Sequence, residues 1–182
     1  MEALEFSIHR DIVEQCIAGD NQSQYELYNL YKKAMFNICY RMANDREEAE
    51  DMLQESFISI FKNIGNYKGT ATIGAWIKRI VVNTSINYLK KKRLQLIPLE
   101  DAHHEREEEP TTDWENVQLQ VQSIKQAVAQ LPDGYRIVFS LYAMEGYDHK
   151  EIAEILGITE STSKSQYNRA KGKIKLLLKQ EG

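Results

Sequence analysis

An acidic tract in the middle of the chain does most to limit how these 182 residues can fold. Between positions 100 and 115 there are eight acidic residues against a single base, Arg106, and the tract also contains Pro110. Such a segment repels itself and has too few apolar side chains to bury, so we expect it to stay extended. The chain is therefore predicted to form two domains, 1–94 and 114–182, joined by a flexible linker over 95–113.

Helical periodicity fills both predicted domains. Apolar residues recur at spacings of three and four, no stretch alternates as a strand would, and the chain has only three prolines. Three residue pairs have the spacing of a capping box, which starts a helix: Asp45 with Glu48, Thr112 with Glu115, and Asp148 with Glu151. We therefore predict an all-α fold with helices over about 7–18, 21–42, 45–65, 72–93, 114–131, 132–145, 148–156 and 160–180.

Other features exclude several classes of protein. No apolar run is long enough to cross a membrane and the N-terminus has no signal-peptide pattern, so we expect a cytoplasmic protein without membrane insertion. Cys16 and Cys39 lie outside any CxxC spacing and are interpreted as buried apolar residues. His103 and His104 are adjacent in the acidic tract, where a solvated loop is the simpler interpretation. The sequence predicts no metal site and no cofactor.

The last two predicted helices fit a helix-turn-helix. Gly157 provides the tight turn four residues after Ala153, a small residue where the helices would cross. On the final helix Ser161, Ser165 and Asn168 share one side, and no acid occurs between positions 161 and 180. Short polar side chains can reach base edges in a major groove, while flanking bases contact phosphates. The flanking bases are Lys164, Arg169 and Lys171. The alternative interpretation of this segment is a solvated basic helix.

A second basic stretch, in the N-terminal half, differs in kind. Positions 56–99 contain no acid but eight bases, and Tyr67 and Trp76 lie close to Lys68 and Arg79. Aromatic faces beside cations and amides suit unpaired bases, although Trp76 taken alone could be a core residue. One surface for duplex DNA and one for separated strands together predict promoter recognition and opening. The stretch also contains Asn83, Asn87 and the run Lys90, Lys91, Lys92 and Arg93.

Acidic residues open the helix that precedes this basic stretch. Their position suits the helix dipole, and a solvated helix face is one interpretation. A metal-dependent nuclease is another, but no second carboxylate cluster supports it. These acids are Glu47, Glu48, Glu50, Asp51 and Glu55.

Three segments carry a resemblance to the extracytoplasmic-function group of bacterial sigma factors, and it covers nearly the whole chain. AEDMLQESFISIF resembles the polymerase-binding helix of that family. YKGTATIGAWIKRIVVNTSINYLKKKR resembles its promoter-opening segment, and LPDGYRIVFSLYAMEGYDHKEIAEILGITESTSKSQYNRAK its reader of the upstream promoter element. The resemblance implies a non-catalytic sigma factor that binds core RNA polymerase and directs promoter-specific initiation, including promoter opening. A polymerase-independent helix-turn-helix regulator is the alternative.

The resemblance also assigns residues to partners. It implies that the acidic linker threads polymerase channels that later carry RNA, and that an anti-sigma factor is a partner. Contacts to the coiled coil of the largest polymerase subunit are implied for Asp51, Gln54, Glu55 and Phe57. Contacts to the downstream element, as duplex and as melted non-template strand, are implied for Tyr67, Lys68, Trp76, Arg79, Ile80, Asn83, Asn87, Lys90, Lys91, Lys92 and Arg93. Contacts to the upstream element are implied for Ser161, Thr162, Lys164, Ser165, Asn168, Arg169 and Lys171.

The sequence departs from the family pattern in the recognition helix. The family usually has Thr-Val-Lys-Ser-Arg-Leu where this chain has the residues of positions 162–167. Ser163 is predicted to weaken an inward apolar position, Tyr167 to fill the space, and Gln166 to remove a cation near DNA. Asn87 stands where an Asp is frequent. These changes bear on which promoter sequence is preferred rather than on the general role.

Overall fold

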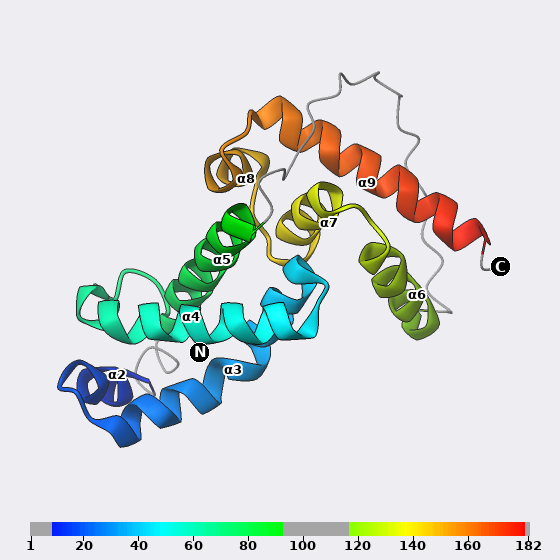
Figure 1. Cartoon of the computed structure of the whole chain (residues 1–182). Coiled ribbons are helices and arrows are strands. Elements are labelled where there is room, and N and C mark those ends of the chain that lie inside the picture. Colours follow the sequence, from blue (N-terminus) through cyan, green and yellow to red (C-terminus); the bar gives the residue numbers. More distant parts are fainter. Residues whose placement is uncertain (1–8, 93–116, 181–182) are drawn as a thin grey trace. The chain divides into compact units, whose positions relative to one another are not determined.

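The computed structural model describes residues 9–92 and 117–180, which form two compact units treated separately below (Figure 1). Every regular element in these two ranges is helical, which confirms the all-α prediction. The predicted linker, the capping pair Thr112 and Glu115, and Arg93 lie outside the described residues. None of the described helices combines the length and apolar character needed to cross a membrane.

The first unit is built from four α-helices and one short 3-10 turn within residues 9–92. Helices α3 and α4 lie side by side, and α5 packs against both of them. Helix α2 packs on α3 and lies beside the N-terminal end of that helix (Figure 1). The elements are α2 (Arg10–Ile17), α3 (Asn21–Ala43), α4 (Arg46–Asn63), η1 (Ile64–Asn66) and α5 (Ile73–Lys92).

Local capping explains where these helices begin and end. The Asp20 carboxylate accepts a hydrogen bond from the Ser23 backbone N–H at 2.7 Å, and Asp45 accepts one from Glu48 N–H at 2.9 Å. Asn44 ends α3 in the left-handed conformation, with φ of 55°, which Asn adopts more readily than most residues. These short-range signals are visible in the sequence, so the predicted boundaries agree with the structure to within a few residues.

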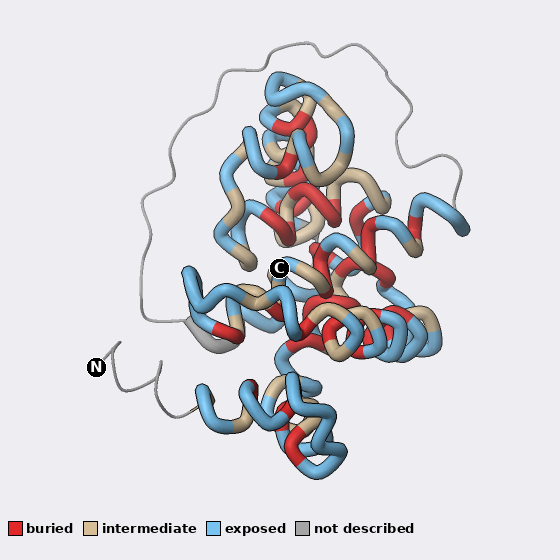
Figure 2. The backbone as a smooth tube through the Cα atoms, turned by 90° about the vertical axis from the view of Figure 1, so that its left-hand side faces the viewer, coloured by how far each residue is buried: buried red, intermediate tan, exposed pale blue. Residues whose placement is uncertain are grey.

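Apolar side chains from α3, α4 and α5 fill the core of the first unit. Figure 2 shows the buried positions recurring as a stripe along each helix, as expected for amphipathic helices. Close packing of this kind holds α4 and α5 at fixed positions relative to each other. The largest fully buried members are Leu27, Met42, Met52, Ile60, Ile77, Ile86 and Leu89.

The second unit covers residues 117–180. Pro132 caps α7 rather than being its first residue, and the predicted single helix over 132–145 changes from α to π geometry at Ser140. Gly146, with φ of 78°, then ends this segment. The elements are α6 (Val117–Ala129), α7 (Asp133–Phe139), η2 (Ser140–Met144), α8 (His149–Leu156) and α9 (Glu160–Gln180).

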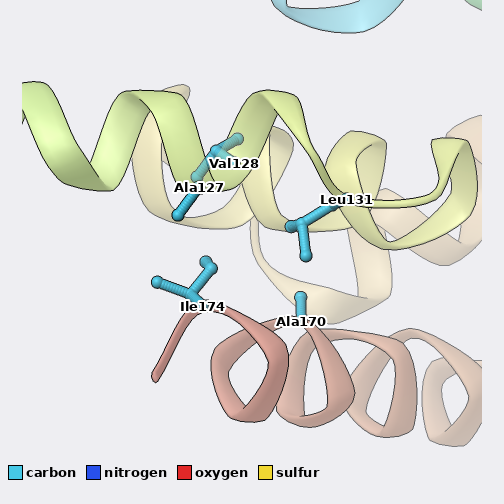
Figure 3. Close-up of a cluster of buried hydrophobic side chains, with 5 residues drawn as sticks. All are labelled: Ala127, Val128, Leu131, Ala170 and Ile174. Atoms are coloured by element: carbon cyan, nitrogen blue, oxygen red, sulfur yellow. The ribbon is translucent and has the colours of Figure 1, made fainter. Parts of the chain in front are cut away.

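Helix α9 is the central helix of the second unit, because α6, α7 and α8 all pack against it. Figure 3 shows Ala170 and Ile174 of α9 facing Ala127, Val128 and Leu131. Because Ala127 and Ala170 are small, α6 and α9 can approach each other closely where they cross. The recognition helix is thus held by a core that runs along its C-terminal half.

Candidate nucleic-acid and protein interfaces

Tyr67 and Trp76 form an aromatic pair at the start of α5. Their ring centroids are 5.6 Å apart, and the Tyr67 hydroxyl donates a hydrogen bond to the Ala71 carbonyl. That bond fixes the loop before α5, in which Gly69 has φ of 68°. Both rings are partly exposed, and partial burial raises the pKa of the Tyr67 hydroxyl. The pair therefore offers aromatic surface at a defined position, and Trp76 is not a fully buried core residue.

Five of the predicted downstream-element residues lie along one side of α5. At about 100° per residue, Ile80, Asn83, Asn87 and Lys90 all lie within about 45° of Trp76 around the helix axis. Asn83, Asn87 and Lys90 are exposed, whereas Ile80 is half-buried. Arg79 flanks this stripe and Lys68 lies in the loop before the helix, both exposed. The structure thus brings together residues that the sequence spreads over more than twenty positions.

The basic end of α5 does not act as one cationic cluster. Lys92 Nζ lies 3.1 Å from a Glu48 carboxylate oxygen, and this contact raises the pKa of Lys92. One turn earlier the Tyr88 hydroxyl donates a hydrogen bond to Asp51 at 3.2 Å. Burial and this bond raise the pKa of Tyr88. Acidic residues of α4 and lysines of α5, which are separated along the sequence, therefore lie opposite each other in the fold.

A shallow polar groove of about 490 Å³ lies between α4 and α5. Glu55, predicted to contact polymerase, shares it with Asn87, Lys90 and Lys91, which are predicted to contact DNA. Lys91 Nζ lies 3.9 Å from a Glu55 carboxylate oxygen, a weak contact between exposed groups. Ser59 and Thr84 complete the lining. The two predicted surfaces are therefore contiguous.

The outer face of α4 presents Asp51, Gln54 and Glu55 to solvent. Phe57 is only 4% exposed and packs 4.9 Å from Tyr28, measured between ring centroids. This burial leaves the Phe57 side chain little area for a partner, so the predicted contact through Phe57 stays a prediction that the packing of α4 does not favour. The neighbouring Ile58 is 64% exposed and lies on the acidic face.

No role was predicted for Ile58 from the sequence. The helical period contains the signal that could have found it. Ile58 falls between Gln54 and Glu55 around the helix, whereas Phe57 falls about 120° from Asp51. Ile58 is thus an exposed apolar side chain surrounded by the polar residues of this face.

The helix-turn-helix of the second unit has the predicted geometry. Asp148 and Glu151 form both bonds of a capping box, at 2.8 and 2.9 Å. Gly157 ends α8 with φ of 71°, and its N–H bonds to the Ala153 carbonyl at 2.9 Å. The Thr159 hydroxyl then accepts a bond from Thr162 N–H at 3.0 Å at the start of α9. These local bonds fix both helix starts and the turn between them.

The predicted upstream-element residues lie on the outer side of α9. Ser161, Lys164 and Asn168 are exposed, and the others are half-buried. Lys164 Nζ is 2.7 Å from a Glu160 carboxylate oxygen, so that cation is paired within the helix. Lys171 Nζ lies 4.7 Å from the centroid of the Tyr167 ring. The half-buried residues are Thr162, Ser165, Arg169 and Lys171.

The departures from the family pattern have structural partners. Ser163 is 0% exposed, and its hydroxyl lies 2.9 Å from Nδ1 of His149. Tyr167 stacks on Phe139 at a centroid distance of 5.7 Å. Gln166 is 8% exposed because its side chain faces inward, and the expectation that it removes a cation near DNA stays a prediction.

Metal binding finds no support in the parts of the chain that the structure covers, since no three potential ligands converge there. Two of the acids in the nuclease alternative are engaged otherwise: Glu48 with Lys92 and Asp51 with Tyr88. Both contacts join the start of α4 to the end of α5.

Comparison with known proteins matches both units to one family. The model of sigma-70 region 2 matches residues 27–95, and that of sigma-70 region 4 matches residues 122–174. The RNA polymerase sigma factor SigZ of Bacillus subtilis is 31% identical over 156 residues, which are 84% of this chain and 85% of SigZ. The ECF RNA polymerase sigma factor SigW of the same species is 29% identical over 175 residues, covering 87% and 90%.

A solved structure has a similar fold. It is the sigma factor RpoE of Bartonella quintana in complex with the anti-sigma factor NepR. The TM-score is 0.55 and the identity 19%, over 85% of this chain and 96% of that one. At this identity the likeness concerns the arrangement of helices.

Proposed function

Because this chain belongs to the extracytoplasmic-function group of the sigma-70 family and directs transcription initiation, we propose a division of that work between its two units. Residues 1–94 bind core RNA polymerase and open the promoter at the downstream element. Residues 114–182 read the upstream element as duplex DNA, and 95–113 connect them. The protein acts without catalysis of its own.

The observation that carries the proposal is the aromatic and amide stripe of α5. Tyr67 and Trp76 can stack with unpaired bases, and Asn83 and Asn87 can hydrogen-bond their edges. Lys68 and Arg79 beside them suit the phosphates of the same strand. Duplex-only regulators do not need a stacking surface of this kind, which favours strand opening as the task of this unit.

The proposed polymerase surface is the outer face of α4. Asp51, Gln54 and Glu55 supply its polar groups, and Ile58 supplies an apolar centre. A desolvated apolar anchor ringed by polar residues is typical of the residues that dominate binding energy. Phe57 supports this face from within the core.

Two further proposals follow from the role. Because RNA polymerase works on the chromosome, the place of action is the cytoplasm. An anti-sigma factor is a proposed partner, supported by the fold shared with RpoE, which was solved in complex with one. Binding of such a factor would cover part of either unit.

Run-off transcription with purified core polymerase tests the proposal. We expect stimulation from a pool of genomic promoter fragments, and no stimulation from any fragment would refute the proposed function. Trp76→Ala and Asn83→Ala should lower promoter opening, measured by permanganate reactivity of unpaired thymines, more than they lower core binding. Equal loss of both activities would refute the assignment of this stripe.

A further inference from the structure

A buried serine joins the two helices of the helix-turn-helix. Ser163 lies in the first turn of α9 on its inward face, where a hydroxyl is costly unless it is hydrogen-bonded. Its partner is the ring of His149, the first residue of α8, at 2.9 Å between Oγ and Nδ1. The bond therefore links the N-terminal turns of the two helices directly.

Aromatic rings hold the histidine in place. Tyr142 of the π segment stacks on His149 with centroids 4.4 Å apart and planes 17° apart. Tyr167 of α9 meets the His149 ring edge-on at 5.7 Å and lies 4.5 Å from Tyr142. Such contacts prefer defined offsets and angles, so each ring restricts the others. The four residues, which we call the His149 cluster, are Tyr142, His149, Ser163 and Tyr167.

The histidine is suited to a fixed, uncharged role. Partial burial, together with the nearby Lys164, holds its pKa below the ordinary value. A neutral ring can accept the Ser163 hydroxyl proton at Nδ1 or donate to the hydroxyl oxygen there, according to its tautomer. Either arrangement satisfies the buried serine.

We propose that His149 is a positioning residue for the recognition helix, setting where Ser161, Ser165 and Asn168 meet the bases. This inference rests on the proposed reading of duplex DNA by α9. Ser163 lies two residues from both Ser161 and Ser165, on the opposite side of the helix. A slide or tilt of α9 at this point moves all three reading side chains together. Because a hydrogen bond to a base is lost within a few tenths of an ångström, small shifts change which sequence is preferred.

Matched variants can separate positioning from mere stability. Ser163→Ala removes the buried hydroxyl, and His149→Phe retains a ring for Tyr142 but removes both nitrogens. The double variant leaves neither partner unsatisfied, so it restores stability if the bond is only structural. Ser140→Ala is the control, since Ser140 is a buried serine of the same unit whose hydroxyl has no hydrogen-bond partner in the described residues.

The assay uses the full chain with core polymerase on promoters whose upstream element is randomised, each linked to a barcode in the transcribed region, followed by sequencing of the transcript barcodes. We expect each single variant, and also the double variant, to lower selection of the preferred element by about tenfold, the effect of losing one base contact. Ser140→Ala should select as the wild type does. Thermal unfolding of each variant is measured in parallel.

Three results would overturn the inference while leaving the proposed function intact. The first is that Ser163→Ala and His149→Phe both select the upstream element as strongly as the wild type does. The second is that the double variant recovers this selection together with its stability. The third is that Ser140→Ala loses as much selection as the single variants do. Should the wild-type protein initiate transcription yet select no upstream element, the proposed reading by α9 itself would be refuted.

Discussion

Phe57 and Ile58 are adjacent in α4, and replacing each by alanine should have opposite consequences. Phe57 is 4% exposed, between the rings of Tyr28 at 4.9 Å and Phe61 at 5.9 Å. Truncating a buried phenylalanine costs about 3–5 kcal/mol, out of a total of about 5–15 kcal/mol for a small domain. Phe57→Ala should therefore lower the unfolding midpoint of the first unit strongly.

Ile58→Ala should leave stability nearly unchanged. Its side chain is 64% exposed, so little packing is lost, and alanine favours the helix by a few tenths of a kcal/mol. Binding to core polymerase should instead weaken by about 5- to 30-fold, because an apolar anchor contributes roughly 1–2 kcal/mol to an interface.

Both quantities can be measured on the full chain. Trp114→Phe leaves Trp76 as the sole tryptophan, so urea unfolding followed by fluorescence then reports the first unit. Core binding is measured by titration of labelled protein with polymerase. Refolded Phe57→Ala at low temperature should bind core with near-native affinity. If Ile58→Ala binds core as tightly as wild type while Asp51→Ala does not, the role of Ile58 is refuted; a stable Phe57→Ala would refute the packing argument.

Burial raises the pKa of the Cys39 thiol from 9.0 to about 11, so the folded state holds this proton more tightly than the unfolded state. The resulting stabilisation, about 2–3 kcal/mol, should be complete below pH 9 and disappear towards pH 11; Cys39→Ala should lack that decline in urea unfolding. Asp148→Ala should lower the free energy of unfolding of the second unit by about 1 kcal/mol, because it removes a helix cap. Unfolding followed by circular dichroism measures this change. Lys92→Gln should leave the urea unfolding midpoint of the first unit nearly unchanged, because Lys92 is largely exposed and ion pairs of exposed lysines contribute little, and a loss as large as that of Phe57→Ala would contradict this.

Helix starts, turns and fold class could be predicted from the sequence because their causes are local. Asp20, Asp45 and Asp148 cap helices through backbone groups three residues away, and Gly157 adopts a conformation that few residues tolerate. The functional family could also be predicted, since its motifs occupy continuous segments.

The candidate site was only partly predictable. The sequence identified Trp76, Asn83 and Asn87 as candidates, and the structure adds that they share one side of α5. The roles of Phe57 and Ile58 depend on which side of α4 meets α3 and α5, and the resemblance to a motif did not settle that.

By itself, the sequence determined that the chain is helical, where its helices begin, and which family it belongs to, because these depend on neighbouring residues. Only the tertiary structure decided that Lys92 faces Glu48, that Ile58 rather than Phe57 is exposed, and that Ser163 bonds to His149. Each of these pairings depends on how packed helices are rotated against each other, a property of the whole core rather than of any one segment.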